Sequence, residues 1–114
     1  MKKFKPIKYT GITVLSHIKI TPEKILNTVA DITCISIEEM KSQKRQAKLV
    51  EARQIAIYLI KKHSKLTLKE IGKMFGNRDH TTVIYAIRTI DGLMEVDKKF
   101  NFYLTNINRK LYEN

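Results

Sequence analysis

A glycine-containing turn between two helix patterns constrains this chain more than any other feature. Thr67 and Glu70 have the spacing of a capping box, which opens a helix. Gly76-Asn77 is typical of a helix stop, and Asp79 can cap the helix that follows. Apolar residues recur at helical spacing on both sides of the turn, at Leu68, Ile71, Phe75, Val83, Ile87, Ile90 and Met94. The pattern predicts a helix-turn-helix.

The remainder of residues 21–114 is also predicted to be helical. Thr21-Pro22 combines a hydroxyl N-cap with a proline at the first helical position, and Ser36 and Glu39 repeat the capping-box spacing. Residues 49 to 63 and residues 96 to 112 each carry one continuous apolar face. Residues 41 to 48 are polar and basic without periodicity, which predicts a loop. The fold class is therefore all-α, a small helical domain.

Residues 1–20 differ from the rest of the chain. They carry five lysines and no acid, and the stretch from Tyr9 to Ile20 is rich in Ile, Val and Thr without a helical stripe. We expect an extended or flexible basic arm at residues 1–20, followed by the helix-turn-helix domain at residues 21–114.

The charge balance points to an anionic partner. The chain carries 22 lysines and arginines against 11 acids, a formal charge of +11 over 114 residues. Such an excess repels itself unless a polyanion neutralises it, and nucleic acid is the first candidate and an anionic membrane surface the second. No apolar run is long enough to span a bilayer. We expect a soluble, cytoplasmic protein with no membrane partner.

Neither catalysis nor metal binding is supported by the sequence. Cys34 is the only cysteine, which predicts a buried thiol rather than a disulfide or a metal ligand. His17, His63 and His80 share no helix face at metal-ligand spacing. We expect no enzyme activity, no cofactor and no metal.

The polar residues around the start of the second helix suit the reading of DNA. In a helix-turn-helix this end lies in the major groove, where Asp accepts from base amino groups, Arg donates to guanine and a Thr methyl meets the thymine methyl. The candidates are Arg78, Asp79, His80, Thr81 and Thr82, with Tyr85 and Arg88 farther along the outer face. The alternative is that these residues only cap a solvated helix end.

A basic stretch precedes the helix-turn-helix. It contains Lys41, Lys44, Arg45 and Lys48 and runs on to Arg53, with Glu51 as its one acid. A basic loop can follow phosphates or enter the minor groove, where narrow A·T tracts attract arginine. The alternative is a solvated charged loop.

Residues 75–86, Phe-Gly-Asn-Arg-Asp-His-Thr-Thr-Val-Ile-Tyr-Ala, closely resemble the signature of one known family, the C-terminal domain of the bacterial replication initiator DnaA. Leu68-Lys69-Glu70-Ile71-Gly72 and Arg53-Gln54-Ile55-Ala56 are similar to two further elements of that domain, and Thr21 to Ile25 to its entry. The similarity covers roughly residues 21–112. It implies a Trp-repressor-like helical fold that binds a short, asymmetric DNA box as a monomer.

The resemblance also implies residue roles. Asp79, His80, Thr81 and Thr82 would face the major groove, and Arg45 would enter the minor groove. Arg53, Gln54 and Arg78 would support the contacts to backbone or bases. Lys44, Lys48 and Arg88 complete the DNA contacts that we expect.

The chain departs from the family pattern in three places. Glu51-Ala52 stands where the family usually has arginine and proline, which puts a negative charge near the expected phosphate path. Gln43, Gln46 and Ala47 thin the basic loop. The family's ATPase domain is absent from this sequence, which has four glycines and no G-x-x-x-x-G-K-[ST] pattern, so we expect no nucleotide partner. The distinct arm favours a stand-alone protein over a fragment.

These observations predict sequence-specific binding to double-stranded DNA at a DnaA-box-like site, linked to replication initiation or its regulation and without ATPase activity. One alternative is a stand-alone transcriptional or replication regulator. Another is an interaction module that has kept the fold and binds DNA weakly and without sequence preference.

Overall fold

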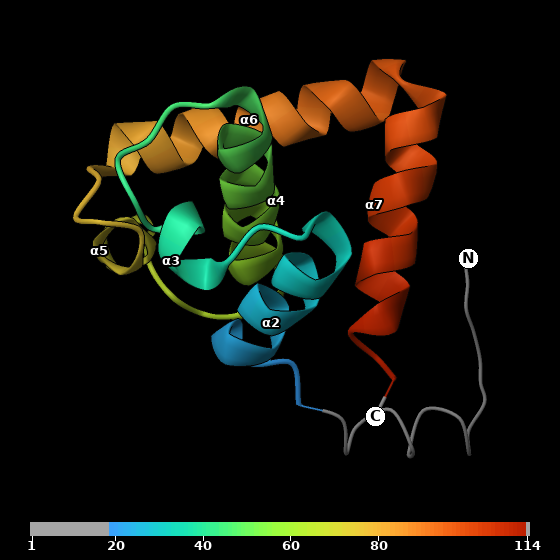
Figure 1. Ribbon diagram of the computed structural model, residues 1–114, viewed down its shortest axis with the longest axis horizontal. Helices are drawn as coiled ribbons and strands as arrows, with labels where there is room; N and C mark the ends of the chain where they lie inside the picture. The colour runs from blue at the N-terminus through green and yellow to red at the C-terminus, as the bar shows by residue number, and fades with distance from the viewer. Residues whose placement is uncertain (1–18, 114) are drawn as a thin grey trace.

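The computed structural model describes residues 19–113, and this part of the chain is built of helices and the segments that join them. The helices are α2 (Pro22–Thr33), α3 (Ile37–Met40), α4 (Ala47–His63), α5 (Leu68–Met74), α6 (His80–Val96) and α7 (Lys98–Lys110) (Figure 1). The all-α prediction is confirmed for the described residues. The expected basic arm falls outside them, apart from its last two residues.

Most helices begin at a side chain that accepts a hydrogen bond from a free backbone N–H group. Thr21, Ser36 and Asp97 cap α2, α3 and α7 in this way, each at 3.1 Å. Thr67 and Glu70 form the full capping box, because the Glu70 carboxylate also accepts from the Thr67 backbone N–H at 2.8 Å. The starts at Thr21, Ser36 and Thr67 agree with the prediction because a cap is a local interaction that a few residues specify.

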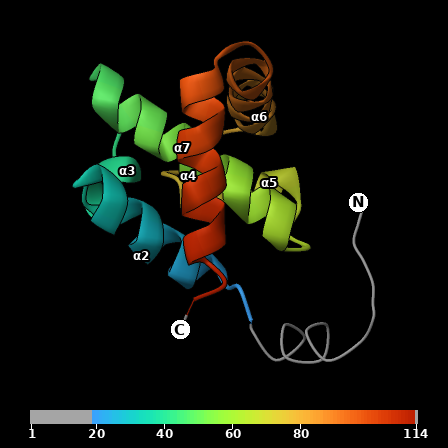
Figure 2. The same cartoon turned by 90° about the vertical axis from the view of Figure 1, so that its right-hand side faces the viewer.

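Helix α4 is the centre of the bundle. It contacts α2, α3, α5 and α6, and Figure 1 shows it upright at the centre, with α6 crossing behind its upper part. Figure 2 shows α7 on the outside of the bundle, beside α6. The core draws on every helix and includes Ile25, Met40, Ile55, Leu59, Ile60, Ile71, Phe75, Val83, Ile90, Leu104 and Ile107. Each such side chain contributes about 1.5–3 kcal/mol by leaving water, so the core fixes α5 and α6 against α4.

The turn between α5 and α6 depends on two successive left-handed residues. Gly76 has φ +80° and Asn77 has φ +59°, a region that glycine and asparagine occupy at the least cost. The chain then returns to α5, where the Arg78 backbone N–H donates to the Gly72 carbonyl oxygen at 2.8 Å. The predicted helix stop is therefore present, and it sets the angle at which α6 leaves.

Three expectations need correction. Helix α4 begins at Ala47, so Lys48 lies in its first turn and the basic loop is residues 41–46. The last helix begins at Lys98 rather than Val96, because Asp97 ends α6 and caps α7. The prediction of a buried Cys34 is wrong: it is exposed and ends α2 in the left-handed conformation at φ +62°, where the chain turns away from the packed face of the helix.

Within residues 19–113, none of the helices combines the length and the apolar character that crossing a membrane requires. The same residues contain no group of three or more His, Cys, Asp or Glu side chains placed to hold a metal ion.

Candidate nucleic-acid interface

The N-terminus of α6 is organised around the Asp79 carboxylate. One of its oxygens accepts from the Thr82 backbone N–H at 3.1 Å, and it also accepts from the Thr81 and Thr82 hydroxyls. These bonds, the one from the Thr81 side chain foremost, hold the pKa of Asp79 below its ordinary value of 3.8. Asp79 is therefore an ionised helix cap, which confirms the cap that the sequence predicted.

The side chains that follow the cap are open to solvent. His80, Thr81 and Thr82 are all exposed, and Tyr85 is 67% exposed. Tyr85 and Arg88 lie four and seven residues after Thr81, so the three share one face of α6. Val83, Ala86 and Ile90 on the opposite face are buried. The helix thus presents a polar face at its N-terminal end while the rest of it is held in the core.

We call residues 78–82 the reading end, and the basic loop passes directly beside it (Figure 1). The Gln43 side-chain amide donates to the Gly76 carbonyl oxygen at 3.1 Å, and Arg78 Nη2 donates to the Ser42 carbonyl oxygen at 2.6 Å. The structure therefore brings together two segments that are more than thirty residues apart in the sequence. The side chains of Lys44 and Arg45 are exposed on this loop.

Arg53 supports the basic loop from inside the protein. The residue is 6% exposed, and its guanidinium donates to the carbonyl oxygens of Met40, Ser42 and Lys44 at 2.6, 3.0 and 2.9 Å. Burial lowers the pKa of Arg53, and the nearby charge of Arg78 lowers it further. An arginine keeps its charge under these conditions, so Arg53 acts here as a cationic brace for three backbone carbonyls.

Arg78 stands at the start of α6, but its side chain binds the basic loop. It is half-buried, it shares the Ser42 carbonyl with Arg53, and its Nε atom is buried without a hydrogen-bond partner among the described residues. Its guanidinium is therefore directed toward the loop rather than outward from α6.

The remaining predicted site residues differ in exposure. Gln54 is half-buried on α4, whereas Lys48 and Arg88 are exposed.

Two lysines of this surface did not enter the sequence prediction. Lys69 and Lys73 line a hollow of about 360 Å³ together with Asn77, Arg78, Asp79 and His80. Both lysines are exposed, and they are neighbours on α5 because they are four residues apart. The four-residue spacing could have indicated from the sequence that the two lysines share a face. Only the packing of α5 against α6 places this pair beside the reading end.

The structure also places Glu51. Its carboxylate lies close enough to Tyr103 of α7 to raise the pKa of that phenol, after the larger effect of burial. Helix α4 therefore directs Glu51 toward α7, whereas Arg53 points toward the basic loop. Glu51 is exposed on α4, and its effect on an approaching phosphate stays a prediction.

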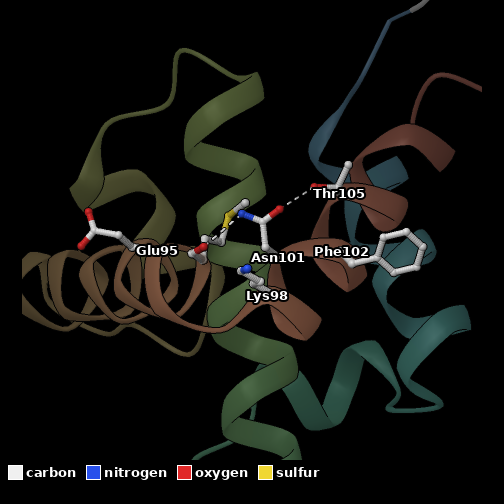
Figure 3. Close-up of a pocket in the computed structure, with 6 residues that line it drawn as sticks. Glu95, Lys98, Asn101, Phe102 and Thr105 are labelled. Atoms are coloured by element: carbon white, nitrogen blue, oxygen red, sulfur yellow. Dashed lines mark hydrogen bonds between the residues drawn. The ribbon is translucent and has the colours of Figure 1, made fainter.

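A second hollow, of about 450 Å³, lies where α6 meets α7 (Figure 3). Its polar side chains are partly occupied with one another, since Asn101 donates to the Met94 carbonyl oxygen at 3.0 Å and accepts from Thr105 at 3.3 Å. Glu95 and Lys98 at its rim carry opposite charges, and Phe102 is 70% exposed. This hollow lies at the end of α6 opposite to the reading end.

The fold and this surface define a helix-turn-helix domain in which α5 and α6 are the two helices of the motif. Residues 22–90 match the family model of the bacterial dnaA protein helix-turn-helix. The chain belongs to this family, which confirms the resemblance that the sequence motifs indicated.

Individual relatives agree with the family match. The chain is 39% identical over 103 residues to the chromosomal replication initiator protein DnaA of a Nostoc species, covering 90% of this chain and 22% of the relative. It is 43% identical over 96 residues to the DnaA of Ehrlichia ruminantium strain Gardel, covering 84% of this chain and 21% of the relative. A crystal structure of a DNA replication initiation factor superposes with a TM-score of 0.70 at 32% identity, covering 81% of this chain and 29% of that one. The chain thus spans about a fifth of the length of the curated relatives that it matches.

Proposed function

We propose that this chain binds double-stranded DNA sequence-specifically, as a monomer and without a nucleotide, at a DnaA-box-like site. The binding would serve replication initiation or its regulation. One observation carries the proposal: an exposed polar helix N-terminus and an exposed basic loop are tied together on one surface. A reading helix and a basic loop side by side suit the simultaneous occupation of a major groove and the adjacent minor groove.

In this proposal the residues divide their tasks. His80, Thr81 and Thr82 reach base edges or neighbouring phosphates in the major groove, while Asp79 holds the helix end in place and is available to a base amino group through its second oxygen. Arg45 enters the minor groove from the basic loop. Lys44, Lys48, Lys69, Lys73 and Arg88 neutralise phosphates, and Gln54 and Arg78 support these contacts.

A fluorescence-anisotropy titration at fixed, near-physiological salt tests the proposal. It compares a duplex carrying a DnaA-type box with a scrambled duplex of equal composition. We expect a preference of about a thousandfold for the box. His80→Ala should cost about 1–3 kcal/mol on the box and little on the scrambled duplex, because a base contact carries sequence information.

Two results would contradict the proposal in different ways. Equal binding of both duplexes would remove the sequence reading and favour an interaction module whose DNA affinity rests on phosphate contacts alone. A loss from His80→Ala that is the same on both duplexes would leave the preference intact but remove His80 from base reading.

A further inference from the structure

We propose that Gln43 is a positioning residue that fixes the basic loop, and with it Arg45, relative to the reading end. The inference deepens the proposed function and rests on it, since it assumes that Arg45 contacts DNA. By resemblance, the family tends to carry more positive or hydroxyl residues in this loop, and the structure shows what a glutamine at position 43 does instead.

The contact between loop and turn is close. We call the Gln43 amide bond to the Gly76 carbonyl oxygen, at 3.1 Å, the loop–turn link. A Cβ atom at position 76 would lie 2.8 Å from the Gln43 amide nitrogen and 2.7 Å from the Lys41 carbonyl oxygen. Such distances do not occur between unbonded atoms of these kinds, so the missing side chain of Gly76 is what lets the loop approach the turn. The Gln43 side chain and the Lys41 carbonyl group both occupy the space that a side chain at position 76 would take.

The link completes a set of restraints on the loop backbone. From inside, Arg53 binds the carbonyl oxygens of residues 40, 42 and 44, and Arg78 binds that of residue 42. Two cations therefore converge on the Ser42 carbonyl, directly before Gln43. The link restrains the loop at residue 43, between the carbonyls of residues 42 and 44 that Arg53 binds, and joins it to the turn.

Arg45 follows this restrained stretch, and its side chain is exposed. An arginine on a fixed backbone loses less freedom on entering a groove than one on a mobile loop, so fixing the loop strengthens binding without a new DNA contact. A positive residue at position 43 would add a phosphate contact and a salt-dependent increment of affinity. Gln43 instead fixes the position of the loop backbone from which Arg45 extends.

The test combines Gln43→Ala with Arg45→Ala in a double-mutant cycle, measured as affinity for the box duplex. Gln46→Ala is the matched control, because Gln46 is an exposed glutamine of the same loop and forms no side-chain cap bond to α4. We expect Gln43→Ala to weaken binding about fivefold to tenfold, the range that one hydrogen bond supplies. In the Arg45→Ala background the same change should have less than about a twofold effect, and Gln46→Ala should have none.

Backbone 15N relaxation of the DNA-free protein supplies a readout that does not depend on DNA binding. Gln43→Ala should lower the heteronuclear NOE at residues 43–46 and leave that of α6 unchanged. Unchanged loop values would overturn the inference, and so would an equal loss of affinity in both backgrounds of the cycle. Failure of the proposed function is a separate result, because it would show as equal binding of box and scrambled duplex by the unmodified protein.

Discussion

Gly72 occupies a position in α5 where only a hydrogen atom fits. A Cβ there would overlap the carbonyl oxygen of Arg78, the residue whose backbone N–H returns to Gly72 at 2.8 Å. We expect Gly72→Ala to destabilise the fold by about 1–3 kcal/mol, the usual cost of overpacking, even though alanine is the better helix former. For a domain of this size each kcal/mol lowers Tm by about 4–8 °C, which a thermal melt followed by circular dichroism measures.

The matched control at this scale is Gly92→Ala in α6. A Cβ at position 92 meets no atom within 4 Å, so the substitution keeps the packing and gains helix propensity of about 0.5–1 kcal/mol. Its Tm should rise by a few degrees. If both alanines raised Tm, the close approach of Arg78 to α5 would not be a constraint on the turn.

Residues differ in how far the sequence predicts their surroundings. The role of Asp79 as a cap was predicted because its partners are two and three residues away. The positions of Arg53 and Arg78 were not, because a long side chain can reach many partners and its choice depends on the packing of α3, α4 and α6. The same limit explains Gln43, whose partner Gly76 is adjacent only after folding.

At the scale of the helices, low pH should reduce the stability that the capping box contributes at the start of α5. Backbone and side-chain hydrogen bonds with Thr67 hold the pKa of Glu70 below its ordinary value of 4.5. A pKa lowered by folding contributes stability above the unfolded value, and this contribution is lost as pH falls through the folded one. We expect Glu70→Gln to have a lower Tm than the parent at pH 7, because the anionic partner at the helix start is gone.

The difference in Tm between the parent protein and Glu70→Gln should become smaller as pH falls from about 6 to 3, since protonation removes the Glu70 charge from the parent as well. Thermal melts at unit intervals of pH measure the difference directly. A gap of constant size across this interval would mean that the Glu70 charge does not contribute to the cap.

Helix starts show why some elements were predicted and why α4 was misplaced. Four helix starts are marked in the sequence by a capping side chain, and each of these helices begins where expected. The caps are Thr21, Ser36, Thr67 and Asp79. Helix α4 begins at Ala47, and its N-cap residue Gln46 forms no side-chain cap bond. Its start is fixed by the restraints on the preceding loop, so no local signal marked it and the prediction placed it two residues late.

At the scale of the whole molecule, α6 connects two ends of different character (Figure 1). The basic loop, Lys69 and Lys73 surround its reading end, whereas α7 begins at its other end with Lys98 and Lys99. The formal charge of +11 does not distinguish these ends. The fold does, because it gathers the cations of α5 and of the basic loop beside the reading end and leaves Lys98 and Lys99 of α7 at the other.

The salt dependence of DNA binding should report this division. Each phosphate contact changes the slope of log K against log salt by about 0.9, so Lys69→Ala combined with Lys73→Ala should make the slope shallower by about two. Because phosphate contacts carry no sequence information, the affinities for box and scrambled duplex should fall together. Lys98→Ala with Lys99→Ala removes the same charge from the far end and should leave the slope unchanged. Equal slopes for the two double variants would mean that net charge, rather than its position beside α6, governs binding.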